Sequence, residues 1–478
     1  MKKRIIIVIL ILIVALAAAG FFGVKYYNDT YITIDGQRYQ RDIRSIKLEN
    51  FSVEIMEQLQ ELPDLQEADL RSLQLTPDVY EAFRTVLPDC DIDWSVPFQG
   101  NYIPCDAAEL TVSTLSDADI AMLKYLPEVT TINAEDCTDY EALLALIQAR
   151  PDLTVTYNVT IGGESWSQDT AEITLDSADP TELEVNLAYL PAVQSVTLKE
   201  IPADPDGMLK LQEAYPEITF SWQIEVCGVV VDAAATEIDL SGIVMEDTQE
   251  LESKLKYMPN LTKVDMCNCG ISNEEMEALN NRHENTLFVW LVEIKGKEFR
   301  TDVTEMMPVK HDLWVNDHDC YNLRYFTELI ALDLGHMFID SCEFVRYMPH
   351  LKYLILADTD VHDLSPLENL NELIFLEIFM CPIRDYTPLT TLSALQDLNI
   401  SYTYGDYEVI AQMTWLQRLW WGQVQESRIS DAQRDYLRSV LPNTEIEFQP
   451  QSSTGKGWRL GQNYFDMRDI FGMAYMTT

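Results

Sequence analysis

The histidines of this chain lie close together in the sequence. All six fall between His283 and His362, in a stretch that also holds Asp317, Cys320 and Cys342. Imidazole nitrogens, thiolates and carboxylates are the ligands that zinc takes in proteins. The spacing matches no zinc motif such as HExxH or paired CxxC, so the preferred interpretation is ordinary polar side chains on a surface and no metal. If a metal were bound, His318, Cys320 and His336 would be the ligands to test.

Other patterns for catalysis are equally weak. Ser253-Lys-Leu-Lys256 matches the SxxK nucleophile motif. It lies in a segment with the pattern of an amphipathic helix, however, and no SDN or KTG motif accompanies it. GxSxG, Walker A and GxGxxG are absent from the sequence. Acidic residues are abundant, yet no spacing singles out a glycosidase pair or a calcium loop. The sequence therefore predicts no enzyme, no catalytic residue and no cofactor.

The charge of the chain excludes one large class of partner. Among its 478 residues 78 are acidic and 33 are basic, which gives a formal net charge of −45. A surface this anionic repels phosphate backbones, so nucleic-acid binding is not expected. Hydrophobic residues make up 47% and aromatic residues 10% of the chain, which favours a folded protein over a disordered one.

The N-terminus predicts a membrane segment. Lys2, Lys3 and Arg4 precede 20 apolar or small residues, 5–24. At 1.5 Å per residue such a helix spans roughly 30 Å, the thickness of the hydrocarbon core of a bilayer. The positive-inside rule places the basic residues in the cytoplasm and the rest outside the cell. A signal peptide cleaved near Ala17–Ala19 is the alternative, which would make the protein secreted.

A short repeat dominates the C-terminal half. The pattern LxxLxL recurs at spacings of 22, 22, 22 and 21 residues, beginning at Leu329, Leu351, Leu373, Leu395 and Leu416. Two copies continue into a Pro-Leu pair, Pro366-Leu367 and Pro388-Leu389. This pattern resembles the leucine-rich repeat, and its 22-residue Pro-Leu version resembles that of bacterial internalins. The resemblance covers residues 323–424 and implies, by analogy, a surface protein for adhesion or recognition.

A longer repeat fills the N-terminal half. Leu62-Pro-Asp-Leu65 returns at Leu126, Leu190 and Met258, at spacings of 64, 64 and 68 residues. Each long unit holds two strand–helix turns and a hairpin-like excursion, which passes through Gly100, Gly162 or Gly228. Capping boxes are expected at Thr138/Glu141, Ser272/Glu275 and Ser430/Gln433, and a proline at the first helical position is expected after Thr76.

Because one strand–helix turn cannot bury its apolar faces alone, neighbouring turns must stack. The predicted fold class is an α/β leucine-rich-repeat solenoid, horseshoe-like, that follows an N-terminal transmembrane helix. The expected segments are a cytoplasmic basic stretch (1–4), a transmembrane signal-anchor or signal peptide (5–24), a juxtamembrane segment (25–42), divergent long repeats (43–322), regular 22-residue repeats (323–425), a C-terminal cap (426–448), and a linker with an aromatic tail (449–478).

Large apolar side chains are expected on the concave face of the solenoid. In LxxLxL strands the leucines point inward and the residues between them point outward. The outward positions predict a contiguous patch, and such patches with aromatic residues mark binding sites. The predicted binding residues are Tyr353, Ile355, Phe375, Phe379, Tyr402 and Trp420. Two alternatives are that the tail covers the patch or that the patch is simply exposed.

The tail supports the first of these alternatives. A linker-like segment, 449–457, precedes large apolar side chains at helix-like spacing, including Trp458 and Phe471. On an anionic protein we expect this tail to dock on the solenoid as a cap rather than to bind a partner.

The sequence therefore predicts a membrane-anchored, cell-surface protein of the bacterial leucine-rich-repeat type that binds a protein or glycan through its concave face. A cell-envelope scaffold or spacer without a soluble ligand is the first alternative. A tail that buries the aromatic patch and an indispensable transmembrane helix would favour it. A carboxylate-based wall hydrolase is the second, which a cleft with two carboxylates of separated pKa values would favour.

Overall fold

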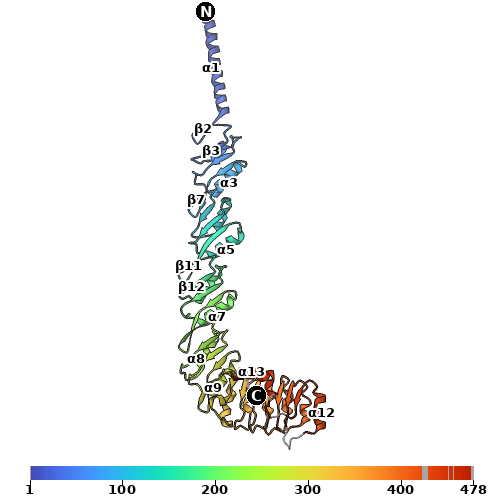
Figure 1. Cartoon of the computed structure of the whole chain (residues 1–478). Coiled ribbons are helices and arrows are strands. Elements are labelled where there is room, and N and C mark those ends of the chain that lie inside the picture. The colour runs from blue at the N-terminus through green and yellow to red at the C-terminus, as the bar shows by residue number, and fades with distance from the viewer. Residues whose placement is uncertain (1, 423–428, 450–451, 456, 475–478) are drawn as a thin grey trace. The chain divides into compact units, whose positions relative to one another are not determined.

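The structure is a computed structural model that describes residues 2–422, 429–449, 452–455 and 457–474 (Figure 1). The chain folds as two compact units, Met1–Trp222 and Gln223–Thr478. Within each unit, strands and helices alternate along the chain (Figure 1). The expected change from long to short repeats at residue 323 lies inside the second unit.

Unit 1 begins with one long helix, α1 (Lys2–Thr30). Its segment Ile9–Thr30 is long and apolar enough to cross a membrane, by length and composition. The helix continues beyond residue 24, where the apolar run ends. It leads directly into the hairpin β1 (Tyr31–Ile34) and β2 (Gln37–Gln40), so the juxtamembrane segment is part helix and part hairpin.

The rest of unit 1 repeats one module three times. Each module pairs an antiparallel hairpin with a three-stranded parallel ladder whose strands are joined by helices. The remaining hairpins are β6 (Ser95–Phe98) with β7 (Asn101–Pro104), and β10 (Thr154–Ile161) with β11 (Glu164–Ser167). The ladders are β3 (Ser45–Lys47), β4 (Glu67–Asp69) and β5 (Asp91–Asp93); β8 (Glu109–Thr111), β9 (Thr131–Ala134) and β10; and β12 (Glu172–Leu175), β13 (Ser195–Leu198) and β14 (Thr219–Ser221).

The helices of these modules connect successive strands of each ladder. They are α2 (Val53–Leu59), α3 (Pro77–Val86), α4 (Asp117–Met122), the 3-10 helix η1 (Leu123–Tyr125), α5 (Tyr140–Ala149), α6 (Pro180–Leu187) and α7 (Pro205–Ala214). Each ladder aligns buried apolar residues at the centres of its strands, as with Ile46, Ala68 and Ile92. Such alignment stacks a row of buried apolar side chains across each ladder.

The helix-start predictions have mixed outcomes. Ser430 and Gln433 form the full capping box, and Ser272 accepts a hydrogen bond from the Glu275 N–H. Pro77 occupies the first turn of α3 as expected, although Thr76 makes no side-chain cap. The Thr138 capping box is wrong because α5 begins one residue later, with Asp139 as its N-cap. The Asp139 carboxylate accepts a hydrogen bond from the Leu115 N–H instead.

Five hairpins turn through two residues that both have positive φ. The pairs are Asp35–Gly36, Gln99–Gly100, Gly162–Gly163, Cys227–Gly228 and Lys295–Gly296. Positive φ at both central positions is typical of type I′ turns, and glycine takes it without steric cost. The predicted excursions through Gly100, Gly162 and Gly228 are therefore confirmed as hairpins.

Unit 2 starts with a fourth copy of the module and a fifth hairpin. Its hairpins are β15 (Gln223–Val226) with β16 (Val229–Asp232), and β20 (Leu291–Ile294) with β21 (Lys297–Arg300). Between them lies the ladder β17 (Glu237–Asp239), β18 (Lys263–Asp265) and β19 (Leu287–Val289), joined by α8 (Gln249–Leu255) and α9 (Asn273–Arg282).

A seven-stranded parallel sheet forms the remainder of unit 2. Its strands, in chain order, are β22 (Glu305–Met306), β23 (Ala331–Asp333), β24 (Tyr353–Ile355), β25 (Phe375–Glu377), β26 (Asp397–Asn399), β27 (Arg418–Trp420) and β28 (Glu445–Glu447). The register places the central leucines of four strands side by side, and all four are fully buried: Leu354, Leu376, Leu398 and Leu419. The predicted α/β leucine-rich-repeat solenoid is confirmed.

The short repeats return to the sheet mostly through 3-10 helices. The connecting elements are η2 (Pro308–His311), α10 (Asp317–Cys320), η3 (Tyr321–Tyr325), η4 (Glu343–Tyr347), η5 (Ser365–Leu367), η6 (Thr387–Thr391), α11 (Tyr407–Ile410) and α12 (Asp431–Val440). Pro366 and Pro388 lie in the first turns of η5 and η6. A 22-residue repeat leaves less chain for the return than a long module does, and the tight 3-10 turn suits short segments.

Candidate functional site on the sheet face of unit 2

The outward side chains of β23–β27 form one surface, the ladder face. The first and third residues of each strand point outward, because the central leucines point into the solenoid. Neighbouring strands of a sheet lie about 4.8 Å apart, so these side chains form columns across the face. The columns are Ala331, Tyr353, Phe375, Asp397 and Arg418, and Asp333, Ile355, Glu377, Asn399 and Trp420.

The C-terminal tail lies on the ladder face. Its described residues, 452–455 and 457–474, include η7 (Trp458–Leu460) and α13 (Gln462–Ile470), and Figure 1 shows α13 beside the sheet of unit 2. Trp458 is fully buried, and its ring centroid lies 5.2 Å from that of Phe375 and 5.9 Å from that of Trp420. One apolar cluster joins the tail to the face: Met307, Ala331, Tyr353, Ile355, Ala357, Phe375, Phe379, Trp420, Trp458, Tyr464, Met467 and Phe471.

The structure brings five of the six predicted binding residues together. They are Tyr353, Ile355, Phe375, Phe379 and Trp420, and each is buried in the cluster with the tail. Tyr402 lies outside this cluster, half-buried, in a left-handed backbone conformation after β26. The patch expected from the sequence therefore exists, and the tail occupies it. A partner reaches these five side chains only when the tail moves away.

Arg418 holds the start of the tail. Its guanidinium donates to the carbonyl oxygens of Gly457 (2.6 Å) and Trp458 (2.9 Å) and forms an ion pair with Asp397 (3.3 Å). The backbone of the tail approaches closely here. A Cβ at Gly457 would lie 2.8 Å from the Trp420 ring, and one at Gly461 would collide with the Arg418 guanidinium. The two glycines thus permit this contact.

Further polar contacts fix the rest of the tail. The Asn399 side chain donates to the Ser453 carbonyl at 2.6 Å, and the Lys310 ammonium donates to the Phe471 carbonyl at 2.6 Å. Asn463 donates to the side-chain oxygen of Gln396 at 3.2 Å. Backbone carbonyls at the end of a helix lack intrahelical donors, so the Lys310 contact caps the end of α13.

Two carboxyl groups of the ladder face lie next to the tail: Glu377 is buried and Asp333 is half-buried. Burial raises the pKa of Glu377 to about 7, although a hydrogen bond from Trp458 Nε1 favours its charged form. Burial also raises the pKa of Asp333 to about 6, while the Gly335 N–H, His336 and Arg468 act in the opposite direction. Glu377 is 5% exposed. A change in the protonation of either carboxyl therefore changes the stability of the docked tail.

These carboxyls do not have the signature of a hydrolase. An acid–base pair needs environments that push the two pKa values apart. Burial instead raises the pKa values of both Glu377 and Asp333. Both residues are outward positions of their strands, and no sequence motif selects them. The available signal was an acidic residue next to an apolar outward position, as with Glu377 beside Ile355 in the strand register.

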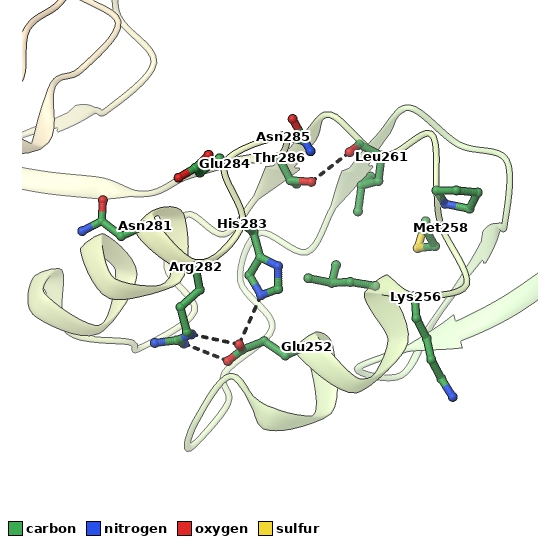
Figure 2. A pocket seen from close by; sticks show the side chains of 12 residues that line it. Glu252, Lys256, Met258, Leu261, Asn281, Arg282, His283, Glu284, Asn285 and Thr286 are labelled. Atoms are coloured by element: carbon green, nitrogen blue, oxygen red, sulfur yellow. Dashed lines mark hydrogen bonds and ion pairs between the residues drawn. The ribbon is translucent and has the colours of Figure 1, made fainter.

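A separate pocket in unit 2 lies between the ends of α8 and α9 (Figure 2). Glu252 accepts hydrogen bonds from Arg282 Nε (3.0 Å) and Nη2 (2.8 Å), from the Thr248 hydroxyl (2.7 Å), and pairs with His283 Nε2 (3.2 Å). These contacts hold the pKa of Glu252 down to about 2. The donors are Arg282 in α9 and the cap residues Thr248 of α8 and His283 of α9, so this network joins the two helices.

Replacing Glu252 with glutamine is expected to destabilise unit 2 by about 1–3 kcal/mol at pH 7, because it removes the charge that accepts three hydrogen bonds. A carboxyl with a lowered pKa stabilises the fold above its unfolded pKa of about 4.5, and the gain is lost as the pH falls through about 2. Urea unfolding of the full chain at pH 7 and pH 3 measures both effects. Glu284→Gln, at an exposed position lining the same cavity, should change neither midpoint; equal effects of the two variants would contradict the assignment.

The weak motifs of the sequence are not assembled into sites. Cys320 is buried with a pKa raised to about 12, His318 is exposed, and His336 pairs with Asp358 at 2.8 Å. In the part of the chain that the structure describes, no group of three or more His, Cys, Asp or Glu could hold a metal ion. The Ser253 hydroxyl of the SxxK match donates to the Glu250 carbonyl of its own helix.

The period and parallel ladder define the class: a leucine-rich-repeat solenoid. Among solved structures the chain is similar to internalin C2 of Listeria monocytogenes, with 22% identity over 28% of this chain and 69% of that chain and a TM-score of 0.22. It is also similar to an internalin, InlF, of the same organism, with 16% identity over 79% of this chain and 89% of that chain and a TM-score of 0.23. A third similar structure is a Leptospira interrogans leucine-rich-repeat protein, with 14% identity over 85% of this chain and 96% of that chain and a TM-score of 0.24. No family model and no curated protein matches. These similarities concern the fold alone.

Proposed function

We propose that this chain is a membrane-anchored, non-enzymatic leucine-rich-repeat protein that recognises a protein or glycan partner outside the cell. The ladder face is the recognition surface, and the tail is its resident occupant. The observation that carries this proposal is the apolar cluster itself, in which Tyr353, Phe375 and Trp420 bind a segment of the same chain.

The composition of the face supports recognition. Contiguous apolar patches that include aromatic residues mark interaction sites, and aromatic side chains dominate binding hot spots. Arg418 and Asn399 add directed hydrogen bonds to backbone carbonyls of the tail, which is how a receptor orients a polypeptide. The face therefore has both the apolar and the polar components of a protein-binding surface.

The first helix supports the membrane location. The segment Ile9–Thr30 has the length of a span, and basic residues stand only on its N-terminal side and at Lys25. Under the positive-inside rule the two folded units lie outside the cell. Secretion after cleavage remains the alternative from the sequence.

The proposal predicts that releasing the tail increases partner capture. Three full-length samples in nanodiscs are compared against cell-surface protein and polysaccharide fractions: wild type, Trp458→Ala, and Trp458→Ala with Tyr353→Asp and Phe375→Asp. We expect the Trp458→Ala chain to retain a ligand at least tenfold better than wild type, because its face is open. The added aspartates should abolish this retention, with folding checked by circular dichroism.

Equal retention by all three samples would contradict recognition through the ladder face. If none of the samples retained a ligand, the result would favour the second candidate, a cell-envelope scaffold. One observation supports that candidate: the tail buries five of the six predicted binding residues, as expected for a cap. Deleting α1 should then abolish the cellular role, because a spacer must be attached.

A further inference from the structure

We infer that the partner of the ladder face is an amphipathic protein helix. This helix presents a tryptophan, an arginine, and apolar side chains at positions i, i+3 and i+7. It displaces the tail by offering a hydrogen-bond acceptor to Trp420. This inference rests on the proposed function and names the chemistry of the partner.

The tail shows which shape the face accepts. Four of its side chains are nearly or fully buried in the contact: Trp458 (0% exposed), Tyr464 (4%), Met467 (2%) and Phe471 (2%). Tyr464, Met467 and Phe471 follow i, i+3, i+7 spacing, which places them on one side of a helix. This is the pattern by which amphipathic helices enter apolar grooves. A glycan has no equivalent of these large apolar side chains.

The polar contacts define the other requirements. Glu377 accepts the indole N–H of Trp458, so an apolar ring without a donor would leave this carboxyl buried and unpaired. The positive charge of Arg468 lies close enough to Asp333 to act against the rise in its pKa. Residues 457–474 hold two arginines, Arg459 and Arg468, and two aspartates, so the tail is neutral on a chain of net charge −45. A strongly acidic helix would be repelled.

The fit of the tail leaves several polar atoms unsatisfied. In the described part of the chain, the indole N–H of Trp420 and the Nε atoms of Arg459 and Arg468 are buried without a hydrogen-bond partner. A buried donor without a partner costs about 1–3 kcal/mol. Trp420 belongs to the face, and its indole N–H has no partner while the tail is docked. A partner helix that places a carbonyl or carboxylate oxygen opposite Trp420 removes the cost and so competes with the tail.

The test uses a fluorescent peptide with the sequence of residues 457–474 and full-length chain in nanodiscs. Fluorescence anisotropy should show saturable binding to Trp458→Ala chain, whose own tail is released, and at least tenfold weaker binding to wild type. The Arg468→Glu peptide should bind more weakly, and a scrambled peptide should not bind. Met467→Asp serves as a second tail-released variant, and Leu460→Ala, at an exposed tail position, as the matched control that behaves like wild type.

Several results would overturn the inference. They are no saturable binding to either tail-released variant, equal binding of the scrambled peptide, or unchanged binding after Tyr353→Asp and Phe375→Asp. If the open face retained a polysaccharide but did not bind the peptide, the result would contradict the helical partner and would still agree with the proposed recognition function. Peptide binding without any ligand from the surface fractions would instead contradict the proposed function.

Discussion

Replacement of Trp458 by alanine is expected to release the tail from the ladder face. The side chain is fully buried against Phe375 and Trp420, and truncating such a residue costs about 3–5 kcal/mol. The change also leaves Glu377 without the indole donor. Since each 1.4 kcal/mol is a tenfold change in an equilibrium, the undocked population should rise by roughly 100-fold or more.

Limited proteolysis with chymotrypsin measures this release, because Tyr464 and Phe471 are buried while the tail is docked and become accessible when it undocks. Cleavage in the tail of the variant should be at least tenfold faster than in wild type, while unit 1 and the rest of unit 2 remain intact. The control is Leu460→Ala, which removes a side chain of the same tail that is 50% exposed. Equal cleavage rates for Trp458→Ala and Leu460→Ala would show that Trp458 does not hold the tail.

Docking of the tail is expected to weaken as the pH rises. The docked state raises the pKa of Glu377 from an ordinary 4.5 to about 7, so docking binds a proton. The resulting stability is fully present below about pH 4.5 and is lost as the pH rises through about 7. A shift of this size corresponds to at most roughly 300-fold in the docking equilibrium. Asp333, with a pKa of about 6, acts in the same direction.

Fluorine NMR of fluorotryptophan-labelled chain measures this dependence through the signal of Trp458, assigned with Trp458→Phe. Between pH 5 and pH 8 the undocked fraction should increase at least tenfold. In Glu377→Gln the increase should shrink to the part contributed by Asp333, because glutamine keeps an acceptor for the indole but does not titrate. A docked fraction that grew with pH, or an unchanged pH dependence in Glu377→Gln, would contradict the role of this carboxyl.

The solenoid could be predicted from the sequence because its signals are local and periodic. Leucines such as Leu354 and Leu376 align simply because each repeat has the same length, and glycines such as Gly100 mark the hairpin turns. Thr138 misled because Asp139 and Thr138 are both good caps, and the contact of Asp139 with Leu115 decides between them. That contact joins residues 24 positions apart, which no local pattern reveals.

The candidate site was only partly predictable. Alternation in the strands identified Tyr353, Phe375 and Trp420 as outward residues, and the sequence also identified the tail as apolar. Whether the tail contacts these outward residues depends on long-range packing. Examples are Gly461 beside Arg418, and Lys310 at the end of α13. The raised pKa of Glu377 follows from that packing alone, so no property of the strand by itself could indicate it.

Hydrogen–deuterium exchange of residues 458–471 in the wild-type full chain at pH 6 tests the docked tail most directly. Helix α13 has nine residues, and an isolated helix of that length is marginal in water, so protection of its amides must come from the ladder face. We predict that the amides of Phe465 and Phe471, which bond to Gly461 and Met467, exchange at least tenfold more slowly than in a free peptide of the same sequence. Exchange at the rate of the free peptide would contradict a docked tail and, with it, an occupied ladder face.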